Sequence, residues 1–90
     1  MTEAHSARLR RLAMRSWRRG IKEMDLILGP YADAHLAGMG EAELDSYDAL
    51  LHENDQDLLT WITGAAPVPP RFDGLIARIG DHCRAGPGKL

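Results

Sequence analysis

The spacing of the apolar residues most limits what this chain can fold into, because that spacing is helical along nearly its whole length. Apolar side chains recur three and four positions apart, and no segment alternates strictly between apolar and polar residues as a half-buried strand does. The clearest stripe consists of Phe72, Leu75, Ile76, Ile79 and Cys83. The pattern therefore predicts an all-α fold, a single small five-helix bundle.

Capping residues, glycines and prolines divide this pattern into segments. We predict five helices, at about 6–18, 21–37, 41–53, 56–63 and from 70 onward. Gly20 and Gly64 are expected to end the first and fourth helices in the left-handed conformation that glycine tolerates. Pro30 lies inside the second stripe, so we expect a kink or a break near Leu28–Gly29.

The chain length bounds the architecture. A chain of 90 residues makes one domain with a thin core, since only about 60% of the unfolded surface is buried at this size. We predict a single domain over 1–90, with an ordered core at about 6–84 and a flexible tail at 85–90. No apolar run is long enough to span a membrane, and we expect a monomer.

The single cysteine and the N-terminal sequence bear on the compartment. Cys83 excludes an internal disulfide and suits a reducing environment, and its place on a buried stripe predicts an inert thiol. The N-terminal stretch is rich in arginine, but it continues without interruption into the first helical pattern. No removable presequence is visible, and we therefore predict a cytoplasmic protein in a bacterial setting.

Charge is distributed unevenly along the chain. Residues 1–23 hold seven Lys or Arg and two Glu, whereas residues 24–70 hold nine Asp or Glu and no Lys or Arg. The basic first helix makes a small nucleic-acid-binding or antitoxin-like module the alternative function, because such a cluster can engage phosphates. The acidic remainder and a pI of about 6 argue against a nucleic-acid partner.

Few residues are arranged for catalysis or metal binding. The candidate metal ligands lack the paired spacing of a zinc site; they are His5, His35, His52, His82 and Cys83. The glycines are scattered at helix ends, so no phosphate-binding loop is present. Glu23 and Asp25 do not share a helix face and form no acid–base pair. We expect a protein that is not an enzyme.

The segment Arg18-Arg19-Gly20-Ile21-Lys22-Glu23-Met24-Asp25 crowds both signs of charge around one glycine. A helix junction accounts for Gly20 and for Glu23, whose carboxylate can satisfy free amides in the first turn of a helix. It does not account for Arg19, since arginine is favoured where a planar, bidentate contact forms. The three residues together are suited to a compact patch for a protein partner.

This segment resembles the R-G-x-x-E signature of the succinate dehydrogenase flavinylation assembly factor family. The surrounding features strengthen the likeness: a basic helix containing Trp17 precedes the signature, and Pro30 follows the glycine by ten residues. A later stretch, Asp55-Gln56-Asp57-Leu58-Leu59-Thr60-Trp61, is similar to the family's D-x-D-L-x-x-W pattern. The resemblance covers about residues 8–84.

The resemblance implies a function that composition alone does not reveal. Members of the family bind the flavoprotein subunit of succinate dehydrogenase, and often that of fumarate reductase, and promote covalent attachment of FAD to a histidine of that subunit. Carried over, the contact residues are Arg19, Gly20 and Glu23, with Arg18 and Asp25 as weaker candidates. No dinucleotide motif is visible, so we expect no cofactor bound tightly by this chain; FAD is attached to the partner.

Overall fold

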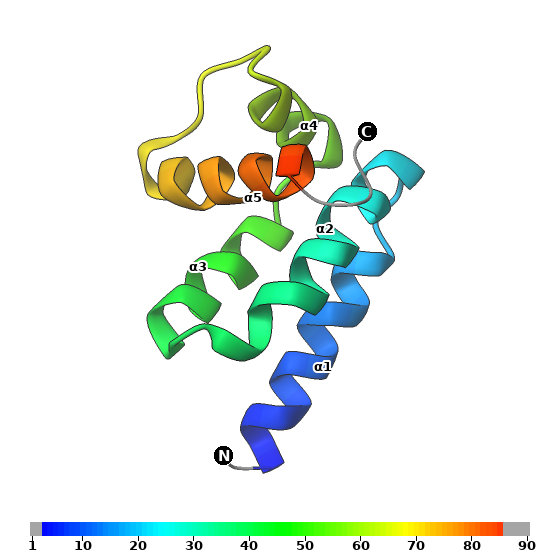
Figure 1. The fold of residues 1–90 in the computed structure, drawn as a ribbon, viewed down its shortest axis with the longest axis vertical. Helices are drawn as coiled ribbons and strands as arrows, with labels where there is room; N and C mark the ends of the chain where they lie inside the picture. The colour runs from blue at the N-terminus through cyan, green and yellow to red at the C-terminus, as the bar shows by residue number, and fades with distance from the viewer. Residues whose placement is uncertain (1–2, 86–90) are drawn as a thin grey trace.

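Five α-helices and two short 3₁₀ turns form the part of the chain that the computed structural model describes, residues 3–85 (Figure 1). The α-helices are α1 (Glu3–Trp17), α2 (Lys22–His35), α3 (Glu41–Leu51), α4 (Asp55–Thr63) and α5 (Asp73–Ala85). The 3₁₀ turns are η1 (Leu36–Gly38) and η2 (Pro70–Phe72). The predicted all-α, five-helix fold is confirmed.

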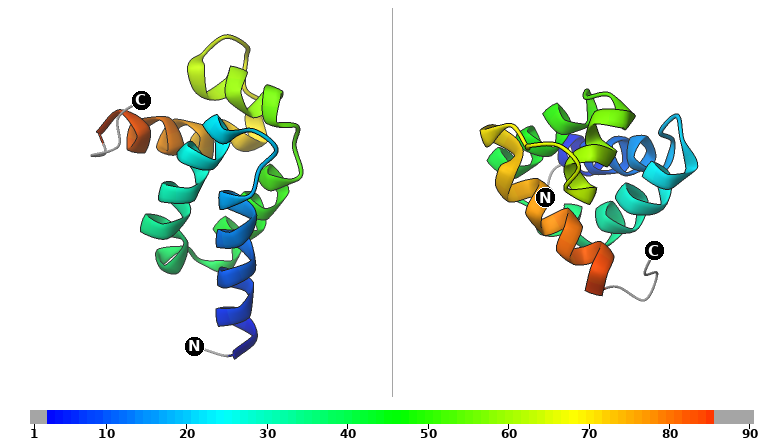
Figure 2. Two further views of the ribbon diagram at one scale, coloured as in Figure 1. Left: turned by 90° about the vertical axis from the view of Figure 1, so that its right-hand side faces the viewer. Right: turned by 90° about the horizontal axis from the view of Figure 1, so that it is seen from above.

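The helices pack in two groups that share one core. Helices α1 and α2 form an antiparallel pair with α3 beside it, and α5 crosses one end of this group with α4 next to it (Figures 1 and 2). The fully buried side chains are contributed by all five helices and include Leu12, Leu28, Tyr47, Leu58 and Ile79. The α1–α2 turn therefore lies at the end of the molecule where α4 and α5 also meet α2.

One buried polar residue is satisfied inside this core. Ser16 is fully buried, and its hydroxyl donates to the Leu12 carbonyl at 2.8 Å and shares a 2.6 Å hydrogen bond with the Tyr47 hydroxyl. Burial is the main reason that the pKa of Tyr47 rises to about 12. The phenol therefore stays neutral and joins α1 to α3.

Local capping rules predict some helix ends correctly. Gly64 ends α4 with a φ of 84°, as predicted. The Asn54 side chain accepts from the Gln56 amide at 2.8 Å and caps the start of this helix. Gly20 does not take the left-handed conformation, so that prediction is wrong. The reason is that α1 already ends at Trp17, and the Gly20 amide is directed to a side chain on α4.

Helix α2 runs through Pro30 from Lys22 to His35, so the break expected near Leu28–Gly29 is absent. Leu28 and Tyr31, on either side of the proline, are buried in the same core and hold both halves of the helix there. Gly29 has another role: a Cβ at this position would overlap the indole of Trp17. Glycine thus permits the close approach of α1 and α2.

Other predicted positions differ in exposure. Trp17 follows the helical spacing of Leu9, Leu12 and Ala13, which predicts burial, but it is 40% exposed, because its ring lies over Gly29 and its Nε1 donates to Asp33 at 3.2 Å. Cys83 is half-buried rather than fully buried. Of the predicted flexible tail, Ala85 is the last residue of α5, and 86–90 lie outside the described residues. The single-domain assignment stays a prediction.

Candidate functional site

The predicted patch lies in the turn between α1 and α2, and its arginine is directed inward. Arg19 Nη1 donates to the Leu51 carbonyl at 2.6 Å, and Nη2 donates to the Glu53 carbonyl at 2.8 Å. Leu51 is the last residue of α3, where carbonyls lack partners within the helix. The guanidinium therefore caps α3 from a position 32 residues earlier in the chain.

The same guanidinium forms an ion pair with the first residue of α4. Arg19 Nε lies 2.6 Å from Asp55 Oδ1, and the two side chains are only 11% and 18% exposed. The other oxygen of this carboxylate, Oδ2, accepts from the Gly20 amide at 2.8 Å. We call this set, made of Arg19, Gly20 and Asp55, the clasp.

The clasp explains why the signature pairs arginine with glycine. A Cβ at Gly20 would lie 3.1 Å from Asp55 Oδ2, which is tighter than ordinary van der Waals contact. Only a residue without a side chain lets the backbone approach the carboxylate this closely without displacing it. Hydrogen bonds between ionised groups are the stronger kind, and low exposure limits their screening by solvent.

Asp25 provides a hydrogen bond that closes the α1–α2 turn, whereas Glu23 does not cap helix α2. Asp25 Oδ1 accepts from the Arg19 amide at 2.6 Å, whereas the N-cap residue of α2, Ile21, has no side-chain cap hydrogen bond. The predicted capping role of Glu23 is therefore wrong. Glu23 is exposed at the second position of the helix, and its carboxylate has no hydrogen-bond or ion-pair partner among the residues the structure describes.

The structure thus divides the five predicted contact residues into two groups. Arg19 and Asp25 form their hydrogen bonds inside the protein, in the clasp and in the turn. Gly20, Glu23 and Arg18 are exposed, and Arg18 lines a shallow depression with Met14, Arg15 and Arg19. The outer surface of the turn therefore presents a glycine between a cation and a free carboxylate.

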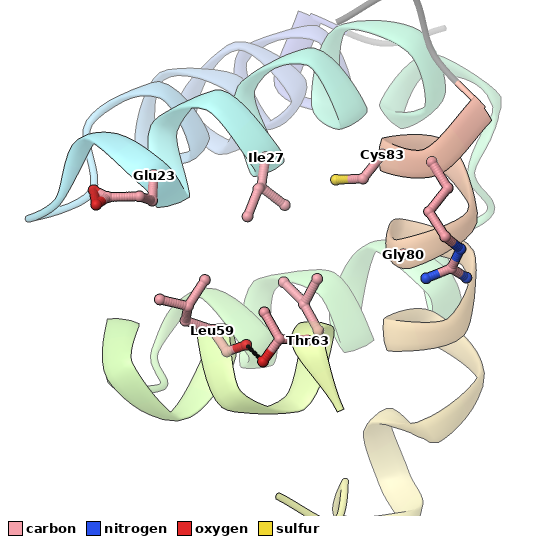
Figure 3. A pocket seen from close by; sticks show the side chains of 8 residues that line it. Glu23, Ile27, Leu59, Thr63, Gly80 and Cys83 are labelled. Atoms are coloured by element: carbon pink, nitrogen blue, oxygen red, sulfur yellow. Dashed lines mark hydrogen bonds between the residues drawn. The ribbon is translucent and has the colours of Figure 1, made fainter. Parts of the chain in front are cut away.

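An apolar groove of about 370 Å³ begins beside Glu23 and runs between α2, α4 and α5. Ile27, Leu59 and Cys83 point toward one another from these three helices (Figure 3). The remaining lining residues are Ile62, Thr63, Gly80 and Arg84. The sequence analysis did not find this groove, because its walls come from segments far apart in the chain.

Two of the four arginines of α1 are paired with carboxylates within the protein. Arg8 contacts Glu41 at 3.0 Å and Asp45 at 2.6 Å on α3, and Arg15 contacts Asp48 at 2.8 Å. The bond from Arg15 is the main cause of the lowered pKa of Asp48. These pairs, like that of Arg19, reduce the positive charge that α1 and the following turn offer to phosphates, although Arg10 and Arg11 are exposed and form no ion pair with the described residues.

The histidines, carboxylates and cysteine of the described residues bear on metal binding and on thiol chemistry. No group of three or more His, Cys, Asp or Glu side chains is placed to hold a metal ion in residues 3–85. Desolvation raises the pKa of the Cys83 thiol, which lowers its thiolate fraction and its reactivity. None of the described helices is both long and apolar enough to cross a membrane.

Sequence reasoning missed the partner of Arg19. In the sequence, Asp55 stands out only as the first residue of the D-x-D-L-x-x-W stretch. Its position at the first turn of a helix, next to the Asn54 cap, signals a fixed carboxylate. Nothing local, however, relates it to an arginine 36 positions earlier.

Fold and site together define a small helical protein in which a glycine turn is held by Asp55 from inside and exposed on its outer surface. The family described as flavinator of succinate dehydrogenase matches residues 10–83. The chain therefore belongs to this family, and the resemblance found in the sequence is confirmed.

Similar proteins carry names that agree. Succinate dehydrogenase assembly factor 2 of Candida glabrata is 48% identical over 65 residues, covering 69% of this chain and 42% of that protein. The protein of the same name from Dictyostelium discoideum is 33% identical and covers 87% of this chain and 56% of its own length. A Drosophila melanogaster relative, succinate dehydrogenase assembly factor 2-B, is 35% identical and covers 86% of this chain and 51% of its own length. The chain thus spans about half or less of the relatives it matches.

These relatives also correct one prediction. Each of the three is named as mitochondrial. The predicted cytoplasmic location is therefore wrong, and the bacterial setting has no support among them. The prediction relied on the absence of a visible presequence, which is a weak argument when the relatives are longer than this chain.

Proposed function

We propose that this protein is an assembly factor that binds the flavoprotein subunit of succinate dehydrogenase and promotes covalent attachment of FAD to it. One observation carries the proposal: the R-G-x-x-E turn is held rigid by the clasp while Gly20 and Glu23 stay exposed. Membership of the flavinator family supports the choice of partner. The fumarate reductase flavoprotein is a second possible client of the same kind.

The proposed mechanism requires no catalytic group from this chain. The flavin bond forms within the flavoprotein, and the assembly factor binds the conformation in which the flavin and the acceptor histidine are aligned. Such alignment contributes several kcal/mol to a reaction, and a binding protein shifts a population only by its differential affinity for the two states. The proposal therefore includes no enzyme activity and no tightly bound FAD for the isolated chain.

Each residue of the turn has a distinct role in this proposal. Gly20 lets the partner's backbone approach without meeting a Cβ, and Glu23 offers an uncompensated carboxylate to a cation or an amide. Arg18 contributes a positive charge on the opposite side of the glycine. Arg19 and Asp25 act as positioning residues, because their polar groups are already engaged inside the protein.

Co-expression with the flavoprotein tests the proposal. Covalent flavin is measured by its fluorescence in a denaturing gel, with this chain as wild type, Glu23→Ala or Lys22→Ala. We expect the wild type and Lys22→Ala, a change at an exposed neighbour outside the predicted patch, to support flavinylation. Glu23→Ala is expected to lose it while retaining its helical circular dichroism. Full flavinylation by Glu23→Ala would refute the site, and no effect of the wild-type chain would refute the function.

Gly20→Arg provides a second perturbation of the same surface. The arginine side chain would crowd Asp55 and cover the exposed backbone at this position, so we expect loss of flavinylation together with a lower melting temperature.

Isothermal calorimetry of the isolated chain with free FAD tests the proposal that this chain binds no FAD tightly. Sub-micromolar binding would contradict it.

A further inference from the structure

The groove beside Glu23 is lined mainly by apolar side chains, and the hydroxyl and thiol that also line it are uncharged. Ile27, Leu59 and Ile62 supply hydrocarbon walls from α2 and α4 (Figure 3). The Thr63 hydroxyl donates to the Leu59 carbonyl at 2.9 Å, so it is satisfied within its own helix. The raised pKa of Cys83 keeps that thiol uncharged. An occupant of the groove therefore needs an apolar surface.

The two charged residues at the groove are not equivalent. Arg84 donates to Asp81 at 2.7 Å, and its charge is thereby compensated. Glu23 has no such partner among the described residues, and Figure 3 shows its carboxylate beyond Ile27 at the end of the groove nearest the α1–α2 turn. The free charge is thus negative, and it favours a cation next to the apolar group.

On the α5 side of the groove, Gly80 lets the Arg84 guanidinium lie close to the helix backbone. A Cβ there would lie 3.2 Å from Arg84 Nη1, so any larger residue would push this guanidinium or narrow the groove. A volume of about 370 Å³ is at the lower end of small-molecule pockets. It suits one or two side chains of a protein better than a cofactor as large as FAD.

We propose that this groove receives an apolar side chain of the flavoprotein partner, and that a Lys or Arg adjacent to it in the partner pairs with Glu23. The proposal rests on the proposed function and deepens it by naming a second contact surface. Glu23 belongs both to the exposed turn and to the groove, so a partner that covers the turn reaches the groove without a gap. The expected recognition element is a short amphipathic segment with a basic residue at one edge.

The only cysteine of the chain reports directly on occupancy of the groove. Alkylation of Cys83 by iodoacetamide at mildly alkaline pH is followed by mass spectrometry of this chain, alone and with an excess of the flavoprotein. We expect the complex to slow alkylation about tenfold or more, as burial in an interface core does. Unchanged alkylation in a formed complex overturns the proposal. If Cys83 is protected from alkylation in the chain alone at high concentration, and size-exclusion chromatography shows a dimer, the proposal is also overturned. The occupant of the groove is then a second copy of this chain.

A pair of substitutions on α4 provides a matched control. Thr63→Arg places a long cation in the groove, whereas Thr60→Arg makes the same change at a position that does not line it. We expect Thr63→Arg to weaken flavoprotein binding about tenfold or more and Thr60→Arg less than about twofold. Circular dichroism checks that both variants fold. If one of them does not, the wild-type chain with Cys83 modified by N-ethylmaleimide provides a groove that is blocked without a substitution.

The outcomes separate the groove from the function. Normal binding by Thr63→Arg and by the modified chain, with loss of binding in Glu23→Ala, overturns the groove and leaves the assembly-factor function intact. No complex with the unmodified chain overturns both. A binding defect in Thr63→Arg that Thr60→Arg does not share supports the groove.

Discussion

Replacement of Asp55 by asparagine tests the clasp with a minimal change of shape. The carboxylate uses separate oxygens for Arg19 Nε, at 2.6 Å, and for the Gly20 amide, at 2.8 Å. Asparagine offers one acceptor oxygen, and its NH₂ group then faces a donor. One of the two hydrogen bonds is therefore lost whichever way the amide is turned.

The cost follows from the burial of this pair. A hydrogen bond to a charged group contributes about 1.5–3 kcal/mol, and exposures of 11% and 18% leave little water to replace it. We expect Asp55→Asn to lower the free energy of unfolding by about 2–3 kcal/mol. A domain of this size has roughly 5–13 kcal/mol in total. At about 4–8 °C per kcal/mol, the melting temperature should fall by roughly 10–20 °C.

Thermal and urea unfolding, followed by circular dichroism at 222 nm, measure this loss. Asp57→Asn is the control, because it removes an exposed carboxylate from the same first turn of α4 without touching the clasp. This control measures how much stability is lost when a carboxylate no longer interacts with the helix dipole, about 0.3–1 kcal/mol. If Asp55→Asn destabilises the protein no more than Asp57→Asn does, the clasp is not the stabilising unit described above.

Three further predictions concern other contacts. Gly29→Ala should destabilise the protein although alanine favours helices, because its Cβ overlaps the Trp17 indole; Trp17→Ala should rescue it in a double-mutant cycle of urea midpoints. The pKa of Tyr47 is raised to about 12, so its contribution to stability is complete below pH 10 and is lost between pH 10 and about 12. Alkaline titration of unfolding should show this loss, and Tyr47→Phe should flatten it. The lowered pKa of Asp48 contributes stability above about pH 4 that is lost as pH falls further. Arg15→Gln should reduce this acid dependence by less than about 1 kcal/mol, since both side chains are partly exposed.

Short-range rules were enough to predict most of the fold. The apolar spacing specifies five helices, and residues such as Asn54 and Gly64 act within one turn of their own position. The same rules failed where a distant segment determines the conformation. Pro30 predicted a kink or a break near Leu28–Gly29, but local rules gave no role to Gly29, whose lack of a side chain is required by the Trp17 ring from α1.

The internal arrangement of the candidate turn could not be predicted from the sequence. The R-G-x-x-E pattern draws attention to this turn, and local rules leave Arg19 without an explanation. That explanation, a carboxylate 36 residues later, depends on how α4 docks. The groove depends on the same docking, because its walls come from three helices.

The clasp has a consequence for the order in which the protein matures. Arg19 and Gly20 are synthesised well before Asp55, and contacts between α1 and α2 are local whereas the clasp closes a long loop. The α1–α2 pair can therefore form early, but the turn between its helices reaches its final shape only after α4 has docked. A truncated or half-folded chain lacks the acceptor that holds this turn. Under the proposed function, a partner that recognises this turn would therefore bind only an assembly factor that has itself finished folding.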